Sequence, residues 1–234
     1  MKLRLITVLF LLSTIPVFSQ SNFYKLGIGG GLGFTQSFTD VKKNGLGAAG
    51  YGLLDYYFTP FLSLGVEGQM GQITGGDVYT DPGNREFIND YKSFSLNGKV
   101  YLGGLIDYQY SKVGNALKGL YLGSGIGVIQ NKMIDIARIS PEGYVYPGKD
   151  KSRDILVPVN IGLNVYFPDR AGDYRYVVNF NFQSNLTFGE GLDGYDNTSV
   201  SLKPGSPDIY NYITVGFRYN LGPIGLSSKT FRRP

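Results

Sequence analysis

Residues 209–221 alternate between apolar and polar side chains with a period of two. This period is typical of a β-strand, because successive side chains of a strand point to opposite faces. One face is aliphatic and aromatic apart from Asn211, and the other carries tyrosines, small polar residues and Arg218. The second face is too polar for a dry core and too poor in charge for an ordinary soluble surface. The pattern therefore favours a strand between lipid and a packed, polar barrel interior.

Seven earlier segments alternate in the same way, and each approaches or exceeds the about 9–11 residues with which a tilted strand crosses a bilayer. They lie at about 24–35, 45–58, 61–73, 91–102, 118–130, 154–167 and 174–188. We therefore predict an all-β fold, a membrane-spanning eight-stranded antiparallel up-and-down β-barrel.

The connections between these segments alternate in length. Short turns are expected at Thr59-Pro60 and at 168–173. Longer loops are expected at 37–44, 74–90, 131–153 and 189–208. Membrane barrels keep short turns on the periplasmic side and long loops outside, which orients the chain. Residues 103–117 break this rule, and the sequence gives no reason for their length.

The beginning of the chain has the three-part layout of a secretory signal peptide: basic residues at 2–4, an uncharged run at 5–18 and small polar residues at 19–21. The uncharged run is shorter than the roughly 20 residues of a spanning helix. We predict a cleaved signal peptide at 1–20, one barrel domain at 21–221 and a short tail at 222–234.

A soluble lipocalin-like barrel, with its apolar face inward, would show the same alternation. Charge distinguishes the two, because only 17% of this chain is charged whereas about 25% is usual. The 34 glycines, 19 tyrosines and 15 phenylalanines also suit small lumen-facing residues and aromatic girdles. A base facing lipid costs about 2–4 kcal/mol, and the strand bases fall on the polar face. These observations favour the membrane.

The composition argues against several kinds of chemistry. The chain has no cysteine and no histidine, which removes disulfides, thiol nucleophiles and the usual general bases and zinc ligands. Acidic residues in the last long loop match no calcium-binding loop; they are Glu190, Asp193, Asp196 and Asp208. The net charge is +4, or +2 (20 − 18) without residues 1–20, and gives no support to nucleic-acid binding. We expect no enzymatic activity, cofactor or metal.

Six charged residues lie on the polar faces of the predicted strands: Lys25, Asp55, Glu67, Lys99, Arg175 and Arg218. The interior of an eight-stranded barrel is about filled by side chains, so these groups should pair. We predict an ion-pair plug in which Asp55 and Glu67 satisfy some of the four bases. The alternative is a set of separate solvated charges near the barrel mouths.

Three features together resemble the small outer-membrane β-barrel family typified by the OmpA transmembrane domain. They are the eight segments after a signal peptide, the Tyr-Phe-Thr-Pro turn at 57–60 leading into 62–67, and the terminal segment 216–221. Thr214, Gly216, Tyr219 and Leu221 resemble the signal that the barrel-assembly machinery reads. The resemblance implies a Gram-negative outer membrane, with its lipid and that machinery as partners. Members of the family often add a peptidoglycan-binding domain, and cell-wall anchoring by that route is not expected for residues 222–234.

The sequence is compatible with two functions. The first is a non-enzymatic structural or surface-binding role through the external loops. The second is that of an accessory subunit in a larger outer-membrane secretion or assembly complex, in contact with other outer-membrane proteins. A solute pore is disfavoured, because eight strands leave little room inside.

Overall fold

The computed structural model describes residues 24–39, 41, 43–106, 108, 111–189, 191–195, 208–222 and 226–227. The predicted signal peptide and most of the predicted tail lie outside these residues. The strands are β1 (Leu26–Phe38), β2 (Leu46–Thr59), β3 (Leu62–Gly76), β4 (Glu86–Tyr101), β5 (Leu120–Ile136), β6 (Lys151–Pro168), β7 (Asp173–Phe188), β8 (Asp208–Leu221) and β9 (Leu226–Ser227). The helices are η1 (Leu102–Gly104) and α2 (Lys112–Leu117).

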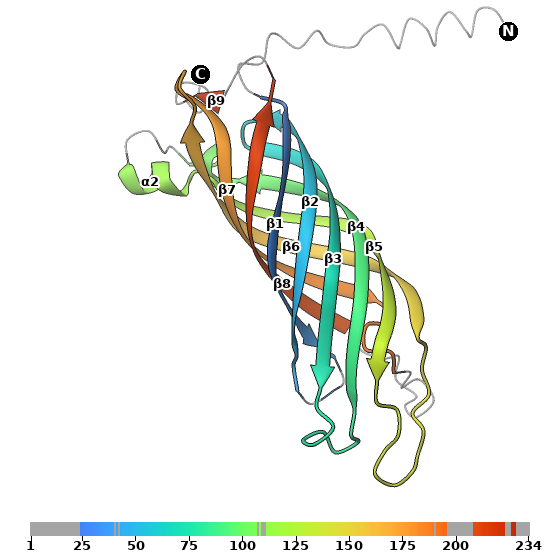
Figure 1. Cartoon of the computed structure of the whole chain (residues 1–234). Coiled ribbons are helices and arrows are strands. Elements are labelled where there is room, and N and C mark those ends of the chain that lie inside the picture. Colours follow the sequence, from blue (N-terminus) through green and yellow to red (C-terminus); the bar gives the residue numbers. More distant parts are fainter. Residues whose placement is uncertain are drawn as a thin grey trace, which may run out of the picture.

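Strands β1 to β8 form a closed barrel. Each strand pairs antiparallel with the next along the chain, and β8 pairs antiparallel with β1, so the sheet closes on itself. Leu26 lies opposite Leu221 and Phe38 opposite Ile209 in that closing ladder. The predicted eight-stranded antiparallel up-and-down barrel is confirmed. The beginning of β1 and the end of β8 share one end of the barrel with the β2–β3 and β6–β7 turns (Figure 1).

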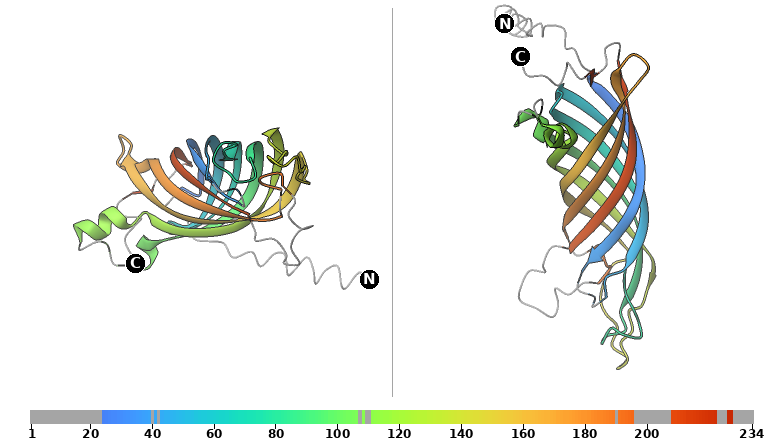
Figure 2. Two further views of the ribbon diagram at one scale, coloured as in Figure 1. Left: turned by 90° about the horizontal axis from the view of Figure 1, so that it is seen from below. Right: turned by 90° about the vertical axis from the view of Figure 1, so that its left-hand side faces the viewer.

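Several strands are longer than the alternation predicted. β4 begins at Glu86, β5 continues to Ile136 and β6 begins at Lys151. The connections there are residues 77–85 and 137–150, which corrects the predicted 74–90 and 131–153. Outward side chains in these extensions include Asp90, Lys132 and Lys151, so the outer face is no longer uniformly apolar although the backbone ladder continues. The β3–β4 and β5–β6 hairpins consequently extend furthest from the end that bears the short turns (Figures 1 and 2).

The long connection between β4 and β5 contains η1 and α2. Ser111 caps α2, its hydroxyl accepting a hydrogen bond from the Gly114 backbone N–H at 3.2 Å. Neither helix of the described residues has the length and apolarity needed to cross a membrane. Part of the predicted tail is also structured, because β9 pairs with the start of β7, with Tyr174 opposite Leu226.

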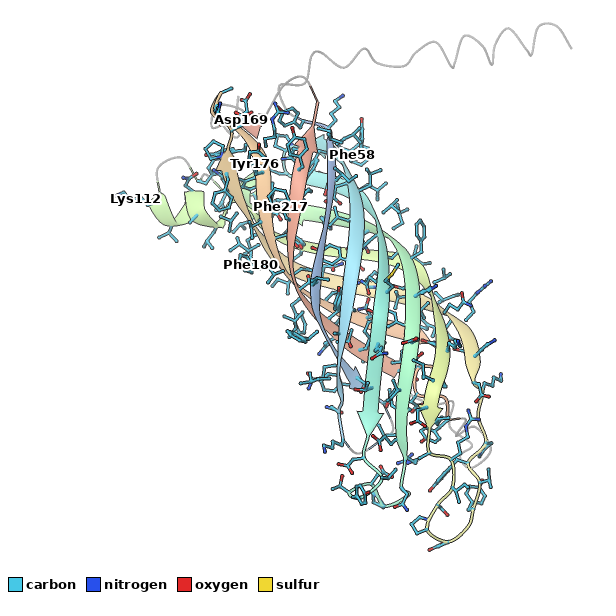
Figure 3. All side chains as sticks on the ribbon, in the orientation of Figure 1. Phe58, Lys112, Asp169, Tyr176, Phe180 and Phe217 are labelled. Atoms are coloured by element: carbon cyan, nitrogen blue, oxygen red, sulfur yellow. The ribbon has the colours of Figure 1, made fainter. Side chains whose placement is uncertain are left out.

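The outer wall of the barrel is an apolar belt of exposed side chains. Leu32 is 75% exposed, and Phe58, Phe180 and Phe217 lie on the outside of the wall (Figure 3). Some of the outer rings contact one another, as Tyr176 and Phe217 do at a centroid distance of 6.1 Å. A soluble monomer does not expose a continuous apolar surface of this size, so the belt faces lipid. The inward apolar face of a lipocalin is thereby excluded.

The inner face is filled by tyrosines, amides and aliphatic residues. Toward the extracellular end, the buried cluster consists of Val41, Ala49, Ile73, Phe87, Tyr91, Ile129, Met133, Leu156, Leu192, Tyr195, Tyr210 and Tyr212. Toward the periplasmic end, Tyr57, Tyr101 and Tyr121 form a second layer. Gly216 shows why inward glycines are needed, because a Cβ atom there would collide with the Tyr51 hydroxyl. Bulky rings thus fill the interior over glycine-lined strands.

Replacing Leu32 by arginine tests the direction of the belt. We expect Leu32→Arg to lower the free energy of unfolding by about 2–4 kcal/mol, because the guanidinium would enter hydrocarbon. Gln36→Arg is the comparison on the same outward face of β1, and it should cost less than Leu32→Arg because Gln36 lies nearer the extracellular end of the strand, from where the guanidinium reaches the interface more easily. Urea unfolding of both variants in liposomes measures the difference. Equal losses would contradict the assignment of the belt.

Candidate functional site

A buried ion network lies in the periplasmic half of the barrel. Asp55 on β2 is fully buried and contacts Lys99 on β4 and Arg218 on β8. Lys99 Nζ lies 3.2 Å from Asp55 Oδ1, and Arg218 Nη1 lies 2.8 Å from Asp55 Oδ2. The residues opposite Asp55 on β1 and β3 are both glycines, Gly27 and Gly65, which leave space for the carboxylate.

Aromatic rings enclose the two bases of this network. The Arg218 guanidinium lies 5.4 Å from the centre of the Tyr57 ring, and Lys99 Nζ lies 5.8 Å from that of Tyr121. Cation–π attraction adds to the ion pairs, and the rings keep water away from them. The network has one carboxylate in contact with two bases, and Glu67 lines the same gap in the lumen as Lys99.

The other three predicted members of the charge cluster lie apart from it. Glu67 accepts a hydrogen bond from Gln69 Nε2 at 2.7 Å, and no base among the described residues lies within 4.0 Å of its carboxylate. Arg175 instead pairs with Asp169 of the β6–β7 turn at 2.9 Å, and this hydrogen bond lowers the pKa of Asp169. Of the predicted ion-pair plug, the structure brings together Asp55, Lys99 and Arg218 in a three-residue network, whereas Glu67 pairs with none of the four bases.

Lys25 is the remaining member, and it directly precedes β1. It forms no ion pair with a described residue. Like Arg175, it lies at the periplasmic rim, where the strand ends meet solvent and a base needs no buried partner. Parity and strand direction place these residues on the polar side in the periplasmic half, but they do not show that Lys25 and Arg175 lie at the rim rather than inside the barrel.

A segment of the last extracellular connection enters the barrel mouth. Residues 191–195, hereafter the plug segment, are all buried. Asn89 Nδ2 donates to the Leu192 carbonyl oxygen at 2.8 Å, and Arg138 Nη2 donates to that of Gly194 at 3.1 Å. The Tyr195 hydroxyl donates to the Ala137 carbonyl oxygen at 2.6 Å. These bonds join the plug segment to the inner wall and to the β5–β6 hairpin.

Burial raises the pKa of Tyr195 to about 12, so its hydroxyl keeps its proton at neutral pH. The plug segment has no periodic pattern of apolar residues, and it was predicted as part of an external loop. Its signal is the presence of Leu192 and Tyr195 among acidic residues. Asp193 accepts from the Tyr195 backbone N–H at 3.0 Å, whereas Glu190 and Asp196 lie outside the described residues.

The middle of the lumen is closed in the described part of the barrel. The gap lined by Glu67, Lys99 and Thr214 has about 0 Å³ into which a water molecule fits. The extracellular cluster and plug segment lie on one side of it, and the tyrosine layer on the other. This arrangement opposes passage of solutes through the barrel.

The two longest hairpins enclose a cleft of about 460 Å³ outside the membrane. This hairpin cleft is lined by Pro82, Gly83, Arg85, Ser140, Pro141, Glu142, Tyr144 and Tyr146. Arg85 pairs with Asp81 at 3.2 Å and lies 5.8 Å from the centre of the Tyr146 ring. The Tyr146 ring in turn contacts Tyr195 of the plug segment at 5.9 Å. The cleft wall is therefore braced from inside the barrel.

The predicted assembly signal lies on β8. Thr214 and Gly216 are on the inner face, and Tyr219 and Leu221 are on the outer side at the periplasmic edge. Tyr219 contacts the Tyr176 ring at 5.7 Å. Tyr219 therefore lies in the periplasmic part of the apolar belt. Recognition of this segment by the assembly machinery stays a prediction.

Comparison with solved structures finds similar barrels. Neisserial surface protein A has a TM-score of 0.50 at 12% identity, covering 84% of this chain and 97% of that chain. Ail, the attachment invasion locus protein of Yersinia pestis, has a TM-score of 0.43 at 9% identity, with 84% and 98% covered. The N-terminal β-barrel domain of Pseudomonas aeruginosa OprF has a TM-score of 0.36 at 11% identity, with 84% and 98% covered.

No protein-family model and no curated protein sequence matches the chain. At such low identity the likeness to neisserial surface protein A concerns the fold alone. It confirms the small eight-stranded barrel that the resemblance to the OmpA transmembrane domain predicted.

The ion network predicts a strong effect of removing its carboxylate. Asp55→Asn leaves Lys99 and Arg218 buried without a counter-charge, and we expect a loss of about 3–5 kcal/mol in the free energy of unfolding. Glu67→Gln is the matched control, because Glu67 is also buried but has no base in contact; its loss should be less than half as large. Denaturant unfolding measures both, and equal losses would refute the three-residue network.

The plug segment predicts a local effect of the Tyr195 hydroxyl. Tyr195→Phe leaves the partly buried Ala137 carbonyl group without the Tyr195 hydroxyl as donor, at about 1–3 kcal/mol. We expect faster amide hydrogen exchange in residues 191–195 while the barrel strands stay protected. Tyr144→Phe is the control, because that ring is 52% exposed. Unchanged exchange in Tyr195→Phe would show that its hydroxyl does not hold the segment in place.

Proposed function

We propose that this protein is a non-enzymatic outer-membrane barrel that binds a ligand at the cell surface through its extracellular hairpins. The proposal rests on the contrast between the closed interior of the barrel and the open hairpin cleft. The interior is packed and closed, whereas the cleft is open to solvent and held in shape by Arg85 and Tyr146. Such a molecule acts on its surroundings by contact.

The outer membrane is the location that the features of the chain support together. A belt that faces lipid, short turns at one end and long hairpins at the other are properties of barrels in that membrane. The signal-peptide pattern of residues 1–20 fits export to it. On this proposal the barrel contacts outer-membrane lipid, and the terminal segment of β8 is used by the barrel-assembly machinery.

The chemistry of the hairpin cleft suits a polar ligand with flat faces. Tyr144 and Tyr146 meet edge to face at 5.3 Å, and their rings offer apolar faces next to hydroxyl groups. Arg85 supplies donors and Glu142 supplies an exposed acceptor at the same opening. Tyrosine-rich surfaces of this kind bind peptides and other amide- or hydroxyl-bearing ligands at a low entropic cost.

A second function, as an accessory subunit of an outer-membrane secretion or assembly complex, is favoured by one observation. The connection between β4 and β5 exposes Leu105, Val113 and Leu117, which are 69%, 67% and 38% exposed. Apolar side chains on a periplasmic connector are suited to a partner protein. Extraction in mild detergent followed by native mass measurement separates the two functions, since a stable heteromeric complex supports the second and a lone monomer the first.

Affinity isolation with cleft variants tests the proposed binding role. We expect the double variant Glu142→Ala and Tyr144→Ala to capture at least about 10-fold less surface ligand than the unchanged chain, as loss of a tyrosine anchor would. Tyr79→Ala is the matched control, because Tyr79 is 94% exposed on the β3–β4 hairpin but does not line the cleft. Equal capture by all three proteins would overturn the cleft as the binding site.

A further inference from the structure

The outer wall carries an apolar groove across β1, β2 and β3. Its volume is about 470 Å³, and it is lined by Leu32, Gly33, Phe34, Ala48, Ala49, Gly50 and Met70. Ala48 and Gly50 are small outward residues between the larger side chains of β1 and Met70 of β3. The groove lies within the apolar belt, so its surroundings are hydrocarbon.

A second groove of about 530 Å³ adjoins it across β3, β4 and β5. This basic groove is lined by Met70, Gly71, Gln72, Asp90, Tyr91, Lys92, Gln130 and Lys132. Met70 lines both grooves, and Lys92 lies opposite Met70 in the β3–β4 ladder. An apolar channel on the wall therefore continues directly into a polar, basic one.

The basic groove belongs to a larger group of bases on the outer wall. In the ladders, Lys92 and Arg153 flank Gln130 from either side, and Lys132 lies opposite Lys151. All four side chains are exposed, and none has a carboxylate within 4.0 Å among the residues that the structure describes. With Asp90 and Asp135 included, the group keeps a charge of +2 (4 − 2).

The depth of these bases in the membrane follows from the neighbouring row of outward side chains on the periplasmic side. Phe94, Val128 and Ile155 occupy neighbouring positions on the same three strands and are 57%, 48% and 52% exposed. Two residues along a strand span about 7 Å, so the bases begin one pleat beyond this apolar row; further out on β5, Ile134 is again apolar and 53% exposed. This is the level at which acyl chains end and lipid headgroups begin.

We propose that the two grooves form a binding site for one phosphorylated lipid of the outer leaflet. Its acyl chain lies in the apolar groove, and its phosphate is bound by Lys92, Lys132 and Arg153. Basic side chains bind phosphate by charge-assisted hydrogen bonds, which are strengthened at the edge of a low-dielectric layer. The inference goes beyond the surface-binding role and rests on the proposed location in the outer membrane.

The contact between the grooves favours a lipid over a free anion. A free phosphate would use the bases but leave the adjoining apolar groove unused, whereas a lipid engages both through one molecule. Strands β1, β2, β7 and β8 reach their extracellular ends with apolar outward residues, among them Phe38, Leu46, Phe188 and Ile209. The bases are thus concentrated on β4, β5 and β6, next to the apolar groove of β1, β2 and β3.

The test measures binding of fluorescently labelled lipid A to the full chain in phosphatidylcholine nanodiscs. Lipid A with its phosphates is compared with the same lipid after removal of the phosphates. The triple variant Lys92→Gln, Lys132→Gln and Arg153→Gln should lose at least about 10-fold in affinity for the phosphorylated lipid and little for the other. The control with the same charge change is Lys112→Gln, Lys149→Gln and Arg170→Gln, three exposed residues elsewhere.

A second variant tests the apolar groove separately. Gly50→Leu fills it, and the added Cβ would lie 3.2 Å from the flexible end of Leu32, so the fold is retained. We expect it to weaken both forms of lipid A alike. Equal affinities of the basic-groove variant and its control, or full competition by inorganic phosphate alone, would overturn the site. Failure to insert into nanodiscs at all would instead refute the membrane location.

Discussion

The whole structure depends on one constraint, that backbone N–H and C=O groups within a bilayer must be paired by the protein itself. The ladder between β1 and β8 meets it, because without that ladder two strand edges would face hydrocarbon. Closure with eight strands then fixes a narrow interior, and the side chains that point inward must fill it. The glycines of β1 and β8 leave space for the large tyrosine side chains that face them, and together they fill the narrow interior.

The two halves of the closed interior are filled in different ways. Near the periplasmic end, a carboxylate lies between two bases that contact aromatic rings. The closed lumen holds little water, so these ion pairs are strong. Near the extracellular end it uses aliphatic and aromatic packing completed by the plug segment. Binding is therefore left to surfaces outside the lumen, namely the hairpin cleft beyond the membrane and the grooves of the wall.

Much of this could be predicted from periodicity, because a strand that separates lipid from a polar lumen has to alternate. Arg218 and Asp55 were assigned to the lumen on that ground, and the orientation of the barrel was predicted from the connection lengths. Contacts between strands could not be predicted in the same way, since the pairing of Asp55 with Arg218 depends on register across the closing ladder. The plug segment was missed because five residues without period carry no strand signal. The extensions of β4 to β6 were missed because outward residues there include bases such as Lys132, whereas inward residues such as Phe87 and Met133 are apolar, which reverses the pattern of the other strands.

The three-residue network joins parts of the chain made at very different times during synthesis. Asp55 and Lys99 are separated by 44 positions, but Asp55 and Arg218 are separated by 163. The carboxylate can meet the guanidinium only after the last strand has docked beside the first. An intermediate in which β1 and β8 are not yet paired therefore lacks the contact between Asp55 and Arg218. The complete network forms only in the closed barrel, so it stabilises the closed barrel relative to an open sheet.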